Sequence, residues 1–148
     1  MILKDNKVTM QGRDGAITIQ RNSYGIPEIT SMSLRDSALA LGWVHANDRQ
    51  MQMMLTRVIL QGRAAEKLSG DKALIEADKY IRSLDLFPDI EEQIKHLEPE
   101  VLECAMAYCD GVNLYLGSAG SVFEFKLLGY RPEPWDLKDT LMLAKSFS

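Results

Sequence analysis

The chain contains little of what most enzyme active sites require. Of its 148 residues only two are cysteine and two are histidine, a poor basis for a zinc site. It has no G-x-S-x-G, G-x-x-x-x-G-K-[ST], G-x-G-x-x-G or H-E-x-x-H motif. Such motifs mark serine hydrolases, P-loop nucleotide sites, dinucleotide folds and zinc proteases. We therefore expect no metal site and no complete set of catalytic residues in this chain.

Long apolar runs and a surplus of positive charge are also missing. The longest uncharged stretches, 37–47 and 111–123, are shorter than the ~18–20 residues of a membrane span. The net charge is −4 and the pI about 5.2, which argues against nucleic acid or an anionic membrane as a partner. Lys4, Asp5 and Lys7 interrupt the place where a signal peptide would be apolar, so the sequence leaves localisation open.

What is present is the composition of a folded protein, with 46% hydrophobic and 26% charged residues. The two cysteines, Cys104 and Cys109, are five positions apart in a segment with helical periodicity. They would be separated by about 140° around the helix axis, so we do not expect a disulfide between them. Cys109 falls on the apolar face and is expected to be a buried free thiol.

Short strands are predicted at the N-terminus. Apolar residues alternate at 8–10 and 17–19 around the turn 12–15, a hairpin pattern. A second turn at 22–25 leads through Pro27 to a strand at 28–30. Three strands with so few apolar side chains cannot make a core of their own. We therefore expect residues 1–31 to join strands that lie outside this chain.

Helices are predicted from residue 33 onward. Ser33 and Asp36 form a capping box, with both side chains expected to bond free amides of the first turn, and the helix should end near Gly62. Further helices are predicted at 64–68, 72–83, after Pro88, after Pro99, and after a capping pair Asp136 and Asp139 that follows a proline-rich connector at 129–135. The prediction is one α+β segment over 1–148, with strands in 1–31 and helices in 33–148.

Asp48 interrupts the apolar stripe of the first long helix, with His45 beside it. An unpaired buried carboxylate would cost several kcal/mol, so Asp48 should be buried and paired with an arginine or with backbone amides. Arg49 and Arg57 are the nearby candidates. A catalytic acid is the alternative, but we favour a structural role for Asp48, Arg49 and His45 as buried polar residues.

The most specific signal in the sequence is a succession of residues in a fixed order: Ile19–Ile29 (IQRNSYGIPEI), Asp36–Ala38, Gly42–Met53 (GWVHANDRQMQM), Arg57, Gly62–Glu66 (GRAAE), Leu68, Gly70, Asp78, Arg82, Ala107–Tyr108, Gly111–Asn113, Glu124–Phe125, Leu128–Gly129, Pro132–Trp135 (PEPW) and Asp139. In this succession the sequence resembles the small chain of the penicillin acylase family, from about Ile17 to the end. Asn22 and Glu28 depart from the family, which usually has Asp at the first position and often His at the second.

The resemblance implies that strands of this chain complete an αββα N-terminal-nucleophile hydrolase fold with a larger partner chain. Such proteins are precursors that cut themselves, and the large chain then begins with the nucleophile, a Ser, Cys or Thr. A free α-amino group has a pKa of roughly 7.7–8.0 and can act as base for its own side chain. The implied reaction is hydrolysis of a linear N-acyl amide, such as a β-lactam side chain or an acyl-homoserine lactone.

The resemblance also implies that no catalytic residue lies in this chain. It places Ser148 and Ala144, on the last helix, at the edge of the acyl pocket. The family resemblance implies that no cofactor is required. It makes a calcium ion possible, with most of its ligands outside this chain. The family's usual location is the periplasm or outside the cell. The alternative function is a non-catalytic helical module that binds a partner protein through its apolar helices.

Overall fold

The computed structural model describes residues 2–4, 7–118, 125, 127 and 129–146. Its N-terminal part is an antiparallel sheet in the order β1-β2-β3-β4, formed by β1 (Ile2–Lys4), β2 (Lys7–Gln11), β3 (Ala16–Arg21) and β4 (Pro27–Thr30). The predicted hairpin and the strand after Pro27 are confirmed. The strand β1 was not predicted, because three residues are too few for an alternating pattern.

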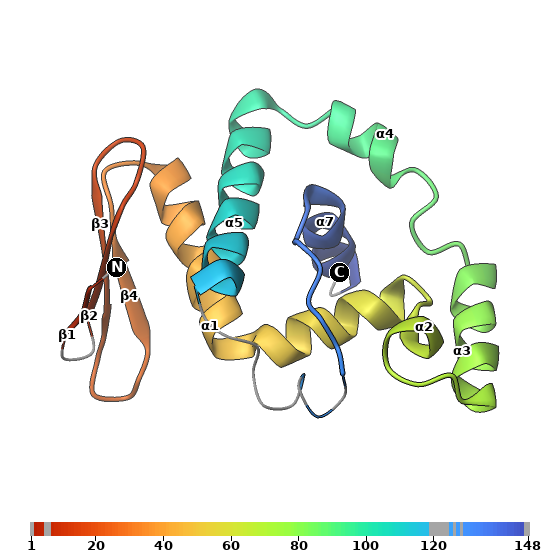
Figure 1. The fold of residues 1–148 in the computed structure, drawn as a ribbon. Helices are drawn as coiled ribbons and strands as arrows, with labels where there is room; N and C mark the ends of the chain where they lie inside the picture. The colour runs from red at the N-terminus through yellow and green to blue at the C-terminus, as the bar shows by residue number, and fades with distance from the viewer. Residues whose placement is uncertain (1, 5–6, 119–124, 126, 128, 147–148) are drawn as a thin grey trace.

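One face of the sheet packs against the first half of helix α1 (Leu34–Leu60) (Figure 1). In β2 and β3 every second residue is buried, as expected when a sheet covers a core with one face only. The buried residues of this cluster are Val8, Met10, Ile17, Ile19, Ala40, Trp43 and Val44. The hairpin therefore finds apolar neighbours within this chain, on α1.

Helix α1 begins and ends where its sequence signals predict. The Ser33 hydroxyl accepts a hydrogen bond from the Asp36 amide at 3.2 Å, and Gly62 just after the helix has a φ of +60°, a conformation that favours glycine. Arg49, however, has non-helical dihedrals of −134° and 22°. The non-helical backbone at Arg49 divides the helix into two segments, and Figure 1 shows the bend between them.

Helix α5 (Pro99–Ser118) lies against the first half of α1 (Figure 1). At their crossing a Cβ atom on Gly42 would lie 2.0 Å from the carbonyl oxygen of Tyr108, and one on Gly111 would lie 1.9 Å from that of Leu39. The two glycines thus allow direct backbone contact between the helices. A second core cluster fills the space between α1, α5 and the segment that follows: Ala46, Met53, Met54, Val58, Ala64, Cys109, Val112, Phe125, Tyr130 and Trp135.

The remaining described helices are α2 (Ala64–Lys67), α3 (Lys72–Ser83), α4 (Ile90–Lys95) and α7 (Leu137–Ser146). Their positions confirm the predicted helices. The capping pair of α7 also forms: the Asp136 amide donates to Asp139 at 3.1 Å and the Asp139 amide donates to Asp136 at 2.9 Å. None of the described helices combines the length and apolarity needed to cross a membrane.

Several apolar side chains remain uncovered. On α1, Leu34 and Leu41 are 66% and 41% exposed. Helix α3 buries only Asp78 and leaves Ile75 and Tyr80 exposed. The described part of the chain is therefore folded around two core clusters but carries apolar surface that nothing in it covers.

Candidate functional site

The predicted buried trio Asp48, His45 and Arg49 lies on the surface of this chain, so the prediction of burial is wrong. In this part of α1 the buried positions are Ala46 and Gln50. Asp48 is two residues from each, about 200° around a helix, and therefore on the opposite face. The buried positions on both sides of the bend include Trp43, Gln50 and Arg57, at steps of seven residues, and this face does not include Asp48.

Asp48 nevertheless has an arginine partner. Its carboxylate oxygens accept hydrogen bonds from Arg21 at 2.5 and 3.1 Å, and Arg21 also donates to the carbonyl oxygen of Gly25 at 2.9 Å. The partner comes from β3, not from the neighbouring Arg49 or from Arg57. This two-point contact ties the end of β3 to α1, a structural role.

Arg57 and Asp139 form a buried ion pair. Their side chains are 2% and 4% exposed and 3.0 Å apart, so α1 and α7 are joined by a pair from which water is excluded. Burial lowers the pKa of Arg57, but the hydrogen bond to Tyr130 and the charge of Asp139 outweigh it and keep the guanidinium charged. Gln61 donates to the other Asp139 oxygen at 3.0 Å.

Arg57 also holds the proline-rich connector between α5 and α7. It donates to the carbonyl oxygens of Pro134 and Glu133 at 3.0 and 3.2 Å, and its guanidinium lies 5.4 Å from the ring centre of Trp135. The Glu133 carboxylate accepts from Arg63 and Lys67, and these contacts lower the pKa of Glu133 to about 2. The connector is thus fixed to both α1 and the start of α2.

Asp36 has a different role from the one predicted. Its carboxylate is fully buried and accepts from the backbone amides of Arg13 and Asp14 at 3.0 Å each, so it binds the β2–β3 turn and not the first turn of α1. Burial raises the pKa of Asp36, but these two hydrogen bonds and the neighbouring Arg35 outweigh it and hold the pKa below its usual value.

Asp78 likewise accepts hydrogen bonds from two consecutive backbone amides. From α3 it accepts from the amides of Ala64 and Ala65 at 2.9 and 2.7 Å, at the start of α2. The sequence marked Asp78 only through the family resemblance, because an amide partner fourteen residues away leaves no local pattern.

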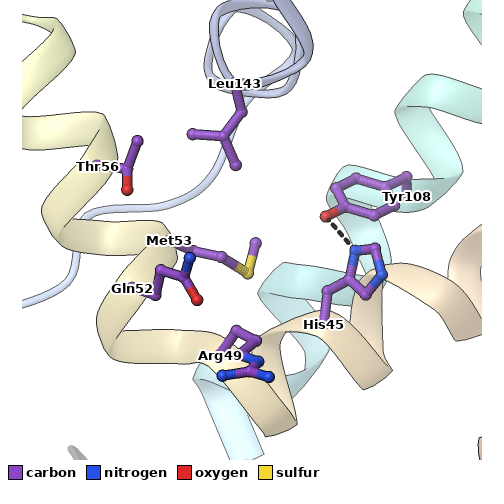
Figure 2. A pocket seen from close by; sticks show the side chains of 7 residues that line it. All are labelled: His45, Arg49, Gln52, Met53, Thr56, Tyr108 and Leu143. Carbon is purple, nitrogen blue, oxygen red and sulfur yellow. Dashed lines mark hydrogen bonds between the residues drawn. The ribbon is translucent and has the colours of Figure 1, made fainter. Parts of the chain in front are cut away.

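A pocket of about 170 Å³ opens at the bend of α1, between α1, α5 and α7 (Figure 2). We call it the kink pocket; its lining residues are His45, Arg49, Gln52, Met53, Thr56, Tyr108 and Leu143. A 3.0 Å hydrogen bond joins His45 Nδ1 to the Tyr108 hydroxyl. Partial burial lowers the pKa of His45. The negative charge of Asp48 raises it by less, so the pKa stays below its usual value and the ring is neutral at pH 7.

The described residues show no activated nucleophile. His45 bonds Tyr108 and His96 bonds a backbone carbonyl of its own helix, so neither imidazole contacts a Ser, Thr or Cys. Burial raises the pKa of the Cys109 thiol, which keeps it protonated, and both cysteines are free. Within the same residues no three His, Cys, Asp or Glu side chains come together as a metal site.

Of the predicted pocket-edge residues, Ala144 lies within the described part of the structure. Ala144 lies exposed on α7, and its neighbour Leu143, not Ala144, lines the kink pocket. Ser148 lies outside the described residues. Their proposed contact with an acyl group stays a prediction.

Comparison with known proteins shows what this arrangement is similar to. A family model described as penicillin amidase matches residues 16–148. A penicillin acylase 2 proenzyme from Pseudomonas sp. (strain SE83) is 38% identical over 130 residues, which is 87% of this chain and 16% of that protein. The acyl-homoserine lactone acylase QuiP from Pseudomonas fluorescens (strain Pf0-1) is 35% identical over 136 residues, 90% of this chain and 16% of that protein.

A solved structure agrees with the sequence relatives. The thermostable penicillin G acylase from Alcaligenes faecalis superposes with a TM-score of 0.79 at 25% identity, covering 92% of this chain and 70% of that chain. The α+β fold class is therefore that of a penicillin G acylase chain. This chain spans about 16% of the length of the curated relatives it matches. From its fold and its sequence, we conclude that the chain belongs to the penicillin amidase family.

Proposed function

We propose that this chain is the small chain of a self-processed amidohydrolase whose nucleophile is the first residue of a larger chain made from the same precursor. The observation that carries the proposal is a family match over residues 16–148 in a chain whose described residues place no histidine beside a nucleophile. The relatives are much longer than this chain, which leaves ample room for the nucleophile elsewhere.

In the proposed reaction the Ser, Cys or Thr side chain attacks the amide carbonyl carbon. Its proton passes to the free α-amino group and then to the leaving amine, as the C–N bond breaks. Water hydrolyses the resulting acyl-enzyme and releases the carboxylic acid. The reaction needs no cofactor, and any calcium ion in the complete protein would be held mainly by residues outside this chain.

The proposed substrates are N-acyl amides, either a β-lactam with an acyl side chain or an acyl-homoserine lactone. The names of the relatives support both classes. We further propose that Ala144, near the end of α7, and Ser148, two positions after that helix in the sequence, border the acyl pocket. The alternative of a non-catalytic helical interaction module has no support from these relatives.

The test is to express the complete reading frame and determine the first residue of any second polypeptide that co-purifies. We expect Ser, Cys or Thr there, and replacement of that residue by Ala should abolish both maturation and amide hydrolysis. A protein that remains one chain and does not hydrolyse phenylacetyl or long-chain acyl amides would contradict the proposal.

The pocket-edge proposal has a separate test. Ser148→Trp should change the ratio of kcat/KM between short and long acyl amides while maturation proceeds normally, because it changes pocket volume and not the nucleophile. Ala144→Trp serves as the second probe of the same edge. Unchanged ratios in both variants would show that this chain contributes scaffold only.

A further inference from the structure

We propose that the kink pocket is a docking site for the large chain of the same precursor, which inserts a carboxylate against Arg49 and an apolar side chain above Met53 and Leu143. This inference rests on the proposed function, since it assumes that a large chain follows this one. It adds where the two chains meet and by what chemistry.

The first argument is the charge of the pocket. The Arg49 guanidinium has no hydrogen-bond or ion-pair partner among the described residues, in contrast to Arg21, Arg57 and Arg63. No acidic residue lines the pocket, and its other polar groups are uncharged at pH 7. The pocket therefore offers one positive charge at a bend in the backbone, complementary to a carboxylate.

The second argument is the apolar floor of the pocket. Met53 is 5% exposed and belongs to the large core cluster, and Leu143 packs against the same cluster. Figure 2 shows both side chains pointing into the space between α1 and α7, with Arg49 on the α1 side of it. A side chain that entered here would extend the core, as anchor residues do at stable interfaces.

The third argument is the surface around the pocket. Leu34, Leu41 and His45 follow at steps of seven and four residues, so they share one face of α1, and the two leucines on that face are exposed. These two leucines lie on the face of α1 that leads to the pocket, and we call them the apolar strip. Apolar side chains exposed together on one face can be covered by a partner surface.

The length outside this chain favours the large chain as occupant. This chain is about 16% of its relatives, so most of the protein is available to cover the strip and the pocket together. A free carboxylic acid could pair with Arg49 but would leave Leu34 and Leu41 exposed. One protein partner could cover the charge of Arg49, the apolar floor of the pocket and the exposed leucines together.

The experiment uses the complete protein with a photo-cross-linking amino acid in place of Gln52, an exposed residue on the rim of the pocket. We expect a cross-link to a peptide downstream of this chain, mapped by mass spectrometry. The cross-linked peptide can be identified whether or not the precursor is cut. If self-processing fails but docking is correct, the cross-link to the downstream peptide still forms. If docking is wrong, that cross-link is missing.

Charge variants complete the test. Arg49→Glu should accelerate separation of the two chains in moderate urea about tenfold or more and abolish the cross-link, while Arg49→Lys should retain the cross-link. The matched control is Arg131→Glu in the connector, the same charge change at an exposed site away from the pocket, and it should leave both the separation rate and the cross-link unchanged. Cross-links confined to this chain, or equal effects of Arg49→Glu and Arg131→Glu, overturn the proposal.

Discussion

Two arginine–aspartate pairs join distant elements of the described structure, and they differ in how much water reaches them. Arg57 and Asp139 are almost completely enclosed, whereas Arg21 and Asp48 are 25% and 33% exposed. Removing one partner from the buried pair leaves a charge that water cannot solvate, but removing one from the exposed pair does not. Burial, and not bond geometry, therefore decides which pair the fold depends on.

The first prediction compares these pairs. Arg57→Ala should lower the free energy of unfolding by about 3–5 kcal/mol, since Asp139 would remain buried without its partner. Asp48→Ala, the control, should cost about 0.2–1 kcal/mol, as exposed pairs do. Urea unfolding of the complete protein measures both. Equal losses of unfolding free energy in the two variants would show that Asp48 is buried in the complete protein, although it is partly exposed in this chain.

The second prediction concerns Asp36 and acid. Because its pKa in the folded protein is lower than in the unfolded chain, Asp36 contributes stability above the usual aspartate pKa of about 3.9, and this contribution is lost as the pH falls through the folded pKa. Asp36→Asn should cost about 1–3 kcal/mol at pH 7.

The difference between wild type and Asp36→Asn should begin to shrink below about pH 4 and should be smallest below the folded pKa of Asp36, where the wild-type carboxyl is also neutral. Denaturant titrations at a series of pH values measure this difference. A constant difference at every pH would mean that the loss comes from one missing acceptor oxygen for the amides of Arg13 and Asp14, and not from the missing negative charge.

At the scale of elements, the contact between α1 and α5 depends on two glycines. Their backbones approach so closely at Gly42 and Gly111 that a methyl group would overlap a carbonyl oxygen of the facing helix. The same contact positions Tyr108 next to His45 at the kink pocket. The helix crossing therefore sets the geometry of one wall of that pocket.

The third prediction tests this crossing. Gly42→Ala should destabilise the protein by about 1–3 kcal/mol or more, because the new Cβ would lie 2.0 Å from a backbone oxygen that cannot move without moving α5. Gly117→Ala in the same α5 helix meets no atom within 4 Å and should be neutral or stabilise by up to about 1 kcal/mol. Thermal unfolding distinguishes the two. Similar effects in both variants would contradict the close packing.

At the scale of the whole molecule, the chain has a core but not a closed surface. Exposed leucines on α1 and exposed apolar residues on α3 remain after the described elements have packed. The chain also spans only part of its relatives' length. A large apolar interface is the physical consequence we expect.

The fourth prediction concerns this chain by itself. Expressed alone, it should bind a dye for exposed apolar surface and unfold with poor cooperativity, whereas the complete protein should unfold sharply. In the complete protein we expect the contact between the chains to bury well over ~2,000 Å². Calorimetry and dye fluorescence are the measurements. A monodisperse chain with sharp unfolding would favour the helical interaction module.

Local signals in the sequence determined where most elements begin and end. Each capping signal lies within a few residues of the boundary that it sets. Examples are Ser33 at the start of α1, Gly62 after its end, and the pair Asp136 and Asp139 at the start of α7. Capping acts through amides that are close in sequence, so one sequence is enough to predict it. The order of matching residues was likewise enough to predict the family.

Only the tertiary structure decided which polar residues are buried and what they bind. Asp48 pairs with Arg21, 27 positions away, and Asp36 binds a turn 22 and 23 positions before it. These outcomes depend on how the sheet, α1 and α5 pack together, because long-range contacts fix burial and partner choice while helical periodicity describes one element at a time.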